Sequence, residues 1–514
     1  MLHLTTATCL RPNAMRTPRP LHGVAATRAL EQAVAAQLPP HALMQRAGLA
    51  LARLAQALAP HAGRLWLACG PGNNGGDGLE AAMHLKRWGR PVCVTWLGHP
   101  DTAPADARAS WQRAVDAGVP FVDAPPPLDA SDLAIDAVLG IGSRRAPEGR
   151  LADALHAMAT STALVLCVDL PSGLDADTGQ PAAVDATPWW QAHPAGRRHT
   201  LSLLTLKPGQ FTAAGRDACG ELWFHDLGIR QDTAADIEPS AWLNAPPPQA
   251  SRLHASHKGL HGDVAVVGGA AGMSGAAVLA AQAALHAGAG RVFLQWLEAP
   301  LQAPVLAPDL MLRPWAGEAA AATLACGCGG GDAVHAALPV LLSRTPRLVL
   351  DADALNAIAA DPMLQALLIA RARHASQATV LTPHPLEAAR LLGTRSADVQ
   401  ADRLAAARAL VQRYGACVLL KGSGSVIAAP DQPLCINPSG NARLATGGTG
   451  DVLAGLLAAR LAQAPAADGH TAFNAACAAA WEHGLAAEQA DPRRALTASS
   501  LAEAMRPPGD RTQS

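Results

Sequence analysis

The sequence predicts an α/β protein with two domains, and three observations support this prediction. Short apolar runs that end in glycine or aspartate alternate with longer segments rich in alanine and leucine. This alternation is typical of parallel βαβ units, in which a buried strand is followed by a loop and a helix. The chain has 514 residues, more than one ordinary hydrophobic core holds. The alternation also stops near residues 231–250 and then restarts.

The break near residues 231–250 sets the predicted domain limits. It contains the run Pro246-Pro247-Pro248 and few apolar residues, which indicates a linker. We therefore predict a first domain at 20–236, a linker at 237–250 and a second domain at 251–506. Parallel strands end at one edge of their sheet, so we expect the polar loops that follow them to form a binding site in each domain.

Composition limits the classes of protein. The formal net charge is −1 and the pI is near 7.0, which argues against nucleic acid or an anionic membrane as a partner. The sequence has no uninterrupted run of about 18 apolar residues, so we do not expect a membrane span. The 10 cysteines are scattered, which is typical of reduced thiols, so we expect a cytoplasmic protein. The closest pair, Cys326 and Cys328, is weak evidence for a metal site.

The first 30 residues contain several arginines and no acidic residue. This composition is similar to that of a transit peptide. A disordered start, with Met15 as the initiator, explains it equally well. We favour the disordered start.

The segment GPGNNGGDG at 70–78 follows an apolar run and precedes a helical pattern at 79–88. One interpretation is that its glycines have no role beyond forming a tight turn between strand and helix. A dinucleotide-binding fingerprint is the alternative, but the spacing differs from GxGxxG. Two asparagines and one aspartate make the segment more polar than phosphate binding requires.

Two further loops bring oxygen atoms to the same predicted edge. Asp136 lies in DAVLGIG, and Asp169, Ser172 and Asp175 lie in VDLPSGLDADTG. Carbonyl, amide, hydroxyl and carboxylate oxygens of these loops can surround a hard cation. One carboxylate then stays free for acid–base chemistry.

These three loops resemble the signature loops of the NAD(P)H-hydrate epimerase family, as do HALMQRAG at 41–48 and LKPG at 206–209. The resemblance implies a Rossmann-like three-layer α/β/α domain that binds K⁺ through Asn74, Asp136 and Ser172. It also implies Asp169 as the substrate-contacting acid, which we nominate as the catalytic residue. The implied substrate loops, at 73–77 and 140–146, contain Asn73, Asn74, Gly75, Gly76, Asp77, Gly140, Ile141, Gly142, Ser143, Arg144, Arg145 and Ala146.

The second domain contains NARLATGGTGD at 441–451, in which glycines and Asp451 open a helical pattern. Free N–H groups at a helix start bind anions, and an aspartate there can deprotonate a hydroxyl. A simple helix N-cap is the competing interpretation. Lys421 in LLKGSGS and His384 in TPHPLE follow other apolar runs. This set is similar to that of ribokinase-like enzymes, which transfer phosphoryl groups.

The ordered motifs from HKGLHGDVAVVGG at 257–269 to INPSGNARLATGGTGDVLAG at 436–455 resemble the ADP-dependent NAD(P)H-hydrate dehydratase family. Two departures stand out: GCGGG at 327–331 replaces the usual GPGLG, and Leu386 replaces a glycine after His384. The resemblance implies that Ala276, Gly329, His384 and Asp451 contact the hydrated dinucleotide, with Asp451 as base. It implies an ADP/AMP site formed by Lys421, Gly422, Ser423, Gly424, Ser425 and Gly450.

The two resemblances imply one repair pathway. The second domain would phosphorylate the ring hydroxyl of (S)-NADHX or (S)-NADPHX from ADP, with Mg²⁺ on the phosphates, and elimination would restore NADH or NADPH. The first domain would interconvert the R and S hydrates with K⁺. We expect a homo-oligomer. One alternative is a true small-molecule hydroxyl kinase as the second domain, and another is a nucleotide-sensing protein with degraded catalysis.

Overall fold

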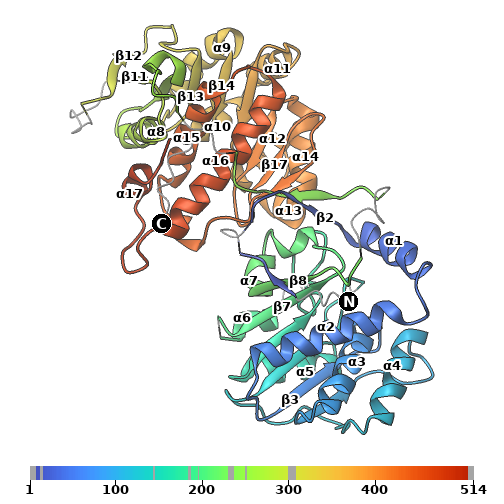
Figure 1. Cartoon of the computed structure of the whole chain (residues 1–514). Helices are drawn as coiled ribbons and strands as arrows, with labels where there is room; N and C mark the ends of the chain where they lie inside the picture. The colour runs from blue at the N-terminus through green and yellow to red at the C-terminus, as the bar shows by residue number, and fades with distance from the viewer. Residues whose placement is uncertain are drawn as a thin grey trace. The chain divides into compact units, whose positions relative to one another are not determined.

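The structure is a computed structural model that describes residues 7–11, 15–142, 145–182, 187–194, 196–229, 237–248, 252–298 and 308–507 (Figure 1). Contacts divide the chain into two compact units. Unit 1 comprises the described residues of 1–14 and 20–241, and unit 2 comprises those of 15–19 and 242–514. The prediction of two α/β domains is confirmed, and each unit is described separately below.

Unit 1 contains a sheet with the order β1-β8-β7-β6-β5-β3-β4. Within the residues described, all neighbouring strands are parallel except β1, which is antiparallel to β8. The strands are β1 (Thr8–Cys9), β3 (Leu65–Cys69), β4 (Val92–Trp96), β5 (Leu133–Ala137), β6 (Leu164–Val168), β7 (Arg198–Leu203) and β8 (Glu221–His225).

Helices cover both faces of this sheet because alternate strand residues are apolar on both sides. Leu65 and Leu67 pack into one core with α2 and α3, whereas Trp66 and Ala68 pack into a second core with α5. The result is the predicted three-layer α/β/α arrangement. The helices are α1 (Val24–Ala35), α2 (Ala42–Leu58), α3 (Asn73–Arg87), α4 (Ala105–Asp116), α5 (Arg150–Thr160), α6 (Trp189–Ala192) and α7 (Gly215–Cys219).

The prediction of a disordered start is wrong for residues 7–11. Strand β1 pairs with β8, and the backbone N–H of Leu10 donates to Leu222 O at 2.8 Å. The Arg11 guanidinium binds Glu221 Oε1 at 2.5 Å. Backbone pairing and this ion pair order a segment whose composition alone gives no sign of a strand.

The predicted substrate loop at 73–77 is also corrected: these residues form the first turn of α3, which begins at Asn73. The glycines permit close packing there. A Cβ at Gly75 would lie 2.0 Å from Gly70 O, and one at Gly76 would lie 2.6 Å from Met44 Cε on α2. Gly78 approaches the side chain of Ala137 in the same way. The glycines therefore allow a helix to start directly behind the strand.

Unit 2 contains most of a larger sheet with the order β12-β11-β10-β13-β14-β15-β16-β17-β18-β9-β2. Strands β12 to β16 run parallel, and β17 is antiparallel to both of its neighbours. The strands are β2 (Arg19–Leu21), β9 (Ala241–Leu243), β10 (Asp263–Gly268), β11 (Arg291–Trp296), β12 (Met311–Pro314), β13 (Thr323–Cys326), β14 (Arg347–Leu350), β15 (Ala378–Leu381), β16 (Cys417–Leu420), β17 (Val426–Ala428) and β18 (Cys435–Ile436).

Strand β9 corrects part of the predicted linker at 237–250. Ala241 and Leu243 are buried, and β9 runs parallel to β18. The backbone N–H of Trp242 donates to Leu434 O at 2.7 Å. Three residues between proline-rich stretches are too short for a periodic signal, so only pairing with β18 identifies this strand. The outer limits 20–236 and 251–506 stay predictions.

An alanine-rich core lies between one face of the unit 2 sheet and α8, α15, α16 and α17. Small side chains let the helices approach closely: a Cβ at Gly455 of α15 would lie 1.9 Å from Ala280 O of α8. Alternate strand residues such as Ala265 and Leu348 are also buried, on the other face. The helices are α8 (Ser274–His286), α9 (Val334–Arg344), α10 (Ala352–Ala360), α11 (Pro362–Arg371), α12 (Pro385–Leu392), α13 (Ser396–Ala401), α14 (Arg403–Tyr414), α15 (Thr449–Gln463), α16 (Gly469–Gln489) and α17 (Ala498–Glu503).

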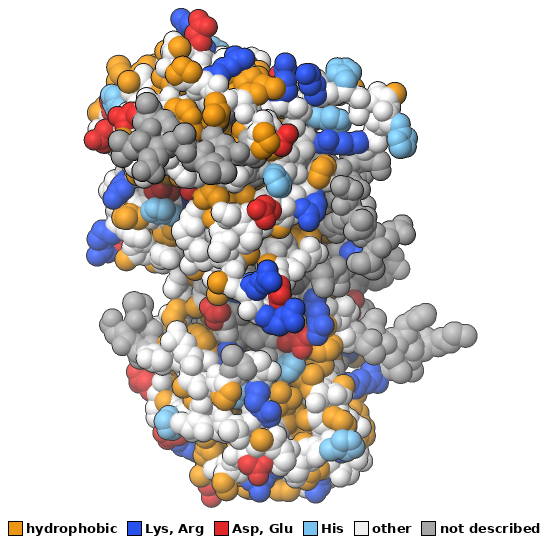
Figure 2. All heavy atoms as spheres, turned by 90° about the vertical axis from the view of Figure 1, so that its left-hand side faces the viewer, with side chains coloured by type: hydrophobic (Ala, Val, Ile, Leu, Met, Phe, Trp, Pro, Cys, Tyr) orange, Lys and Arg blue, Asp and Glu red, His pale blue; other side chains and the backbone are white. Residues whose placement is uncertain are grey.

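The near-zero net charge and the lack of a long apolar run predict a surface of mixed charge and no membrane span. On the face in Figure 2, acidic and basic side chains are interspersed rather than gathered in one field of a single sign. Among the described helices, none combines the length and apolar character needed to cross a membrane.

Candidate active sites

The unit 1 site lies where the strand order reverses. The chain leaves β3 for β4 on one side and then crosses to β5 on the other side of β3. Such a switch opens a crevice at the carboxyl ends of the two strands. Gly70 follows β3 there, and a Cβ at this position would lie 1.8 Å from Val138 O after β5. Glycine is therefore needed for the two strand ends to approach so closely.

Three residues predicted to bind K⁺ come together at this crevice. The Ser172 hydroxyl donates to Asp136 Oδ1 at 2.6 Å, and the Ser172 backbone N–H donates to Asp136 Oδ2 at 2.8 Å. The Leu139 carbonyl oxygen accepts from Asn74 Nδ2 at 3.0 Å and lies 3.3 Å from Ser172 Oγ. Asp136, Ser172, Asn74 and Leu139 thus bring four oxygen-bearing groups to one place.

Asp136 is fully buried, and this burial raises the pKa of its carboxyl. Hydrogen bonds from Ser172 and from the Val138 backbone oppose the shift. A buried carboxylate prefers a positive partner. Asp175, by contrast, is engaged elsewhere, because its Oδ1 accepts from the backbone of Asp177 and Thr178 within a turn.

Asp169, the predicted catalytic acid of unit 1, has a left-handed backbone with φ of 64°. Its Oδ1 accepts from the ammonium of Lys207 and from the Leu203 N–H at 3.0 Å, and Gln210 Nε2 donates to its carbonyl at 2.9 Å. The side chain of Lys207 is fully buried, whereas that of Asp169 is 14% exposed. Lys207 therefore contacts the carboxylate from the protein side, and the remaining edge of the carboxylate stays partly accessible.

Asp77 provides a second carboxyl with a different protonation preference. It lies in the first turn of α3 and is half-buried. Burial raises its pKa well above the usual value, and the charges of Asp169 and Glu31 add to this effect. One carboxylate held by a lysine and one carboxyl that retains its proton are suited to opposite proton-transfer roles.

The remaining predicted residues of unit 1 lie in the segment after β5. Gly140 packs on Asn74, since a Cβ at Gly140 would lie 3.2 Å from Asn74 Cβ. Gly142 lies beside the Arg28 guanidinium, since a Cβ at Gly142 would lie 2.6 Å from Arg28 Nη2. Ile141, Arg145 and Ala146 continue this segment, whereas Ser143 and Arg144 lie outside the described residues.

Sequence reasoning missed Lys207 and Glu31 as members of the site. Lys207 was quoted within LKPG but not assigned a role, because it is 38 positions from Asp169. Only the fold brings the start of η2 (Pro208–Gln210) under the end of β6. The available signal was a lysine shortly after a mostly apolar run that ends at Leu206, in an otherwise uncharged stretch.

The unit 2 site lies at the carboxyl ends of β13, β14, β15 and β16, which are adjacent and parallel. Lys421 follows β16, and its ammonium donates to Asp351 Oδ1 at 2.6 Å, directly after β14. Glu387 Oε2 lies 4.0 Å from the same ammonium. Burial lowers the pKa of Lys421, but these two carboxylates outweigh it and raise the pKa overall.

His384 is connected to this cluster through Glu387. Its Nδ1 accepts the Leu386 N–H at 3.1 Å at the start of α12, and its Nε2 lies 3.3 Å from Glu387 Oε1. Burial lowers the pKa of His384, and the charge of Lys421 lowers it further. The imidazole is therefore neutral at physiological pH and presents Nε2 toward the site. Leu386, the departure from the family glycine, is 46% exposed and does not displace His384.

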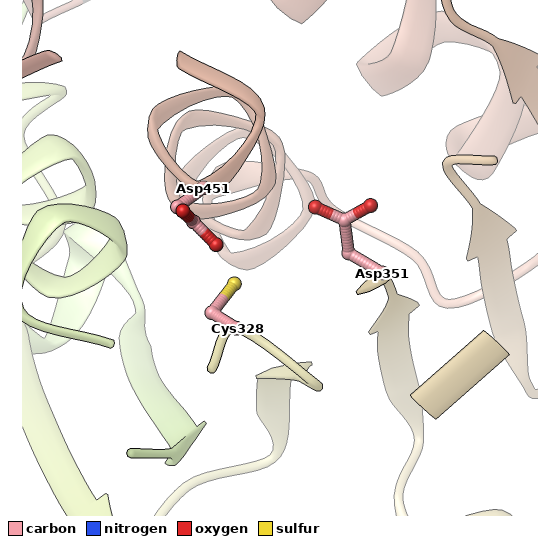
Figure 3. Close-up of side chains that lie close together, drawn as sticks. All are labelled: Cys328, Asp351 and Asp451. Atoms are coloured by element: carbon pink, nitrogen blue, oxygen red, sulfur yellow. The ribbon is translucent and has the colours of Figure 1, made fainter. Parts of the chain in front are cut away.

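Asp451, the predicted base, lies in the first turn of α15 opposite Asp351 and Cys328 (Figure 3). One carboxylate oxygen of each aspartate and Cys328 Sγ all lie within 4.8 Å of one another. Burial raises the pKa of Asp451 from 3.8 to about 6, with a further contribution from the charge of Asp351. Such a carboxylate is ionised at neutral pH but is a stronger base than an exposed aspartate.

The start of α15 also offers an anion site. Gly448 adopts φ of 88° as N-cap, and the Thr449 hydroxyl donates to Leu444 O at 2.8 Å. A Cβ at Gly450 would lie 3.4 Å from Lys421 Nζ. The free N–H groups of this turn, the helix dipole and the Lys421 ammonium therefore converge on one place.

The other predicted residues surround this place on two sides. Ala276 in α8 faces Gly329, whose added Cβ would lie 3.0 Å from Ala276 Cβ. On the other side Lys421–Ser425 form the turn between β16 and β17, where Gly422 has φ of 143° beside Arg403. Ser425 Oγ donates to Gly422 O at 3.2 Å. The structure thus brings Asp451, Gly450, Lys421 and His384 together through shared partners.

Asp351, Glu387 and Cys328 are the members of the unit 2 site that sequence reasoning missed. Glu387 and Cys328 lie in the motifs TPHPLE and GCGGG, and Asp351 lies in the segment LVLDADALN at 348–356, yet none was given a role. Asp351 directly follows an apolar strand, a position from which its function can be inferred. Glu387 resembles an ordinary capping-box residue, which it also is.

The cluster of Cys328, Asp351 and Asp451 does not suit Mg²⁺ held by protein alone. The Lys421 ammonium already occupies one oxygen of Asp351. Burial raises the pKa of the Cys328 thiol well above its usual value, and a protonated thiol is a poor ligand for a hard cation. We therefore assign no magnesium ligands to this cluster.

The fold and these sites define an enzyme with two separate α/β catalytic units. Two family models match the chain: NAD(P)H-hydrate dehydratase at residues 264–507 and YjeF-related protein N-terminus at residues 40–209. Together they cover most of both units. The motif interpretation of each domain thus agrees with an independent comparison.

Curated relatives agree with the family models. The Bifunctional NAD(P)H-hydrate repair enzyme Nnr of Escherichia coli K12 is 36% identical over 475 residues, which is 87% of this chain and 84% of the relative. The enzyme of the same name from Moorella thermoacetica is 34% identical and covers 89% of each chain. The ADP-dependent (S)-NAD(P)H-hydrate dehydratase of Neisseria meningitidis is 44% identical over 266 residues, 50% of this chain and 86% of the relative. The chain belongs to the family of bifunctional NAD(P)H-hydrate repair enzymes.

Proposed function

We propose that this protein repairs hydrated nicotinamide nucleotides in two steps on one chain. Unit 1 interconverts R- and S-NAD(P)HX, and unit 2 dehydrates S-NAD(P)HX to NAD(P)H with conversion of ADP to AMP and phosphate. The observation that carries the proposal is the convergence of Asp451, Lys421 and the α15 N-terminus beside His384. Family membership supports this reaction over a true hydroxyl kinase or a sensor with degraded catalysis.

In unit 2 the transferred group is the terminal phosphoryl group of ADP. Asp451 accepts the proton of the substrate ring hydroxyl as its oxygen attacks this phosphorus. The N–H groups at the start of α15 and the Lys421 ammonium stabilise the charge on the transferring group. Phosphate is a better leaving group than hydroxide, so its elimination restores the reduced ring. A Mg²⁺ ion bound with ADP would supply further neutralisation of the phosphate charge.

We carry the contacts of each ligand over from the family resemblance, and the positions of these residues support the assignment. The turn at 421–425 and Gly450 bind the nucleotide, and Ala276, Gly329 and His384 bind the hydrated dinucleotide. Because His384 is neutral, its Nε2 can hydrogen-bond the substrate without opposing the cationic nucleotide site.

In unit 1 we assign Asp169 as the acid–base residue. The Lys207 ammonium pairs with the Asp169 carboxylate, and the raised pKa of Asp77 makes Asp77 a proton donor in the same crevice. The segments at 73–77 and 140–146 hold the dinucleotide. An epimerase makes the R hydrate available to a stereospecific dehydratase, which gives a chemical reason for the fusion.

Potassium fits the oxygen cluster of unit 1. Asp136, Ser172, Asn74 and the Leu139 carbonyl are hard ligands, and the buried Asp136 lacks a Lys or Arg partner among the described residues. The amide of Asn74 directs its nitrogen to Leu139 O, and rotation by 180° would turn Oδ1 to the same place. A bound K⁺ would neutralise the buried carboxylate and fix the Ser172 loop beside Asp169.

The Asp136 site can be tested with an isosteric change. Asp136→Asn should lower epimerisation of R-NADHX by roughly 10-fold or more, because it removes the negative charge of a proposed K⁺ ligand, and changes even to the outer partners of a metal site typically cost this much. Activity of the parent protein should depend on K⁺ rather than choline, and the variant should lose this dependence. Equal rates in KCl and choline chloride for the parent protein would contradict the potassium assignment.

The whole proposal is tested with the purified chain, racemic NADHX and either ADP or no nucleotide. We expect reduced-nicotinamide absorbance to return completely with ADP, with one AMP formed per NADH. Phosphate ester accumulating without return of absorbance would instead support the kinase alternative. Parallel assays with ATP and with NADPHX measure the preferences between donors and between substrates.

Two further proposals concern the state of the protein. We place it in the cytoplasm, because its ten free cysteines suit a reducing compartment. We also propose a homo-oligomer, which sedimentation equilibrium tests directly.

A further inference from the structure

The turn after β13 places a thiol where the carboxylates of unit 2 converge. Cys328 is fully buried, and its Sγ lies within 4.8 Å of a carboxylate oxygen of both Asp351 and Asp451. In Figure 3 the sulfur points toward the Asp451 carboxylate, from the turn that faces the start of α15. No step of the proposed reaction uses this thiol, so its position requires another explanation.

The turn that carries Cys328 is fixed on both sides. Gly327 and Gly329 have φ of 113° and 58°, and a Cβ on either would lie within 2.4 Å of a backbone oxygen. The Cys328 carbonyl accepts the Gly269 N–H at 3.1 Å. Because the backbone is held by these contacts, the fold sets the direction of the Cys328 Cα–Cβ bond, and with it the few positions that Sγ can take.

The thiol retains its proton in this environment. Burial raises the pKa of Cys328 well above its usual value, and the charges of Asp451 and Asp351 raise it further. A protonated thiol is a weak hydrogen-bond donor. A hydrogen bond from Cys328 lowers the pKa of Asp451 and so opposes the effect of burial.

We propose that Cys328 is a positioning residue for dehydration: its S–H donates to Asp451, orients this carboxylate toward the substrate hydroxyl and favours its ionised form. The inference rests on the proposed role of Asp451 as base. Only a side chain with a hydrogen-bond donor can take this role. The related GPGLG motif has a proline at the position of Cys328, and the proline side chain has no donor.

Other groups around Asp451 set the background against which the thiol acts. Asp351 and Asp353 raise the pKa of Asp451, and Lys421 lowers it. His483 of α16 binds Thr449 O at 2.9 Å, and burial lowers its pKa to about 4, so it is neutral. All of these groups are retained when Cys328 is substituted, so a change in the pH profile reports on the thiol.

The test is the pH profile of kcat/KM for (S)-NADHX with saturating ADP, measured on the full chain. In Cys328→Ala we expect the acidic limb to move upward by about 0.5 pH unit and the plateau to fall roughly 3- to 10-fold. Cys328→Ser restores a donor and should recover most of both effects. Epimerisation by the same preparations checks that unit 1 is intact.

Cys326→Ala is the matched control. Cys326 is also buried, two positions earlier in β13, and its raised pKa comes from burial without any contribution from Asp451. Both alanine variants delete one buried sulfur, so a general packing effect would appear in both. If Cys328→Ala keeps the acidic limb of the parent protein, or if Cys326→Ala moves it equally, the inference is wrong.

Comparison of Cys328→Ala with Asp451→Asn distinguishes failure of the positioning role from failure of the proposed function. If Asp451→Asn dehydrates (S)-NADHX normally, Asp451 is not the base and the role of Cys328 falls with it. If Asp451→Asn is inactive while Cys328→Ala has an unchanged profile, the base assignment stands and only the positioning role is overturned.

Discussion

Asp451→Asn should lower the ADP-dependent return of NADH from (S)-NADHX by roughly 10²- to 10⁴-fold, the usual contribution of a positioned general base. Asparagine has the shape of aspartate but cannot accept the hydroxyl proton. The loss should appear in kcat, because nucleotide and dinucleotide contacts made by Lys421 and His384 are retained. Single-turnover recovery of reduced-nicotinamide absorbance measures it.

Epimerisation is the internal control for Asp451→Asn. Asp451 belongs to unit 2, whereas the assigned epimerase residues belong to unit 1. Equilibration of the R and S hydrates should therefore proceed at the parent rate. Loss of both activities in a folded protein would contradict the division of labour between the units.

Asp451 also has a predicted effect on stability. Its pKa rises from 3.8 to about 6 on folding, so the native state binds more protons than the unfolded chain between these pH values. The free energy of unfolding therefore falls as pH rises through this window. Asp451→Asn removes the penalty and should stabilise unit 2 at pH 7 by up to about 3 kcal/mol. Calorimetry should show this gain at pH 7 and its disappearance near pH 4.

Asp169→Asn should lower epimerisation by a similar factor of roughly 10²- to 10⁴-fold and leave dehydration of (S)-NADHX unchanged. Asparagine is the informative substitution here because Asp169 has φ of 64°, a conformation that asparagine tolerates better than alanine. With racemic substrate and ADP, the variant should stop when about half of the hydrate has been converted.

Lys207→Met separates the charge of Lys207 from its packing. It leaves the Asp169 carboxylate without its buried counter-charge, which typically costs about 3–5 kcal/mol of stability. Epimerisation should fall as well. The double variant Asp169→Asn, Lys207→Met should regain part of the stability, because no unpaired charge is left. If Lys207→Met alone is as stable and active as the parent, the ion pair has neither role.

The α/β class and the positions of most strands could be predicted from the sequence because strands in parallel sheets are buried on both faces. Leu65–Cys69 and Val264–Val267 are continuous apolar runs for this reason. The same rule placed Asp136, Asp169, His384, Lys421 and Asp451 at strand ends or helix starts. Family resemblance then added roles to residues that local pattern only located.

Short paired elements were not predictable in this way. Strands β1 and β9 have two and three residues, and their evidence is hydrogen bonding to β8 and β18. The helical start of α3 at Asn73 was missed because its glycines suggest a loop. Those glycines are instead required by close contacts in the folded chain, with Gly70 of the same segment and with Met44 and Ala137 from other elements.

The sequence by itself determined that two α/β units carry polar groups at strand ends, since strand burial and strand-end chemistry are local properties. Only the tertiary structure decided which groups meet. Lys207 lies under Asp169, Lys421 pairs with Asp351, and the Cys328 thiol faces Asp451. These contacts join residues tens to more than a hundred positions apart. Their energies depend on burial and on distances of a few ångströms, which arise only when the strands are assembled in order.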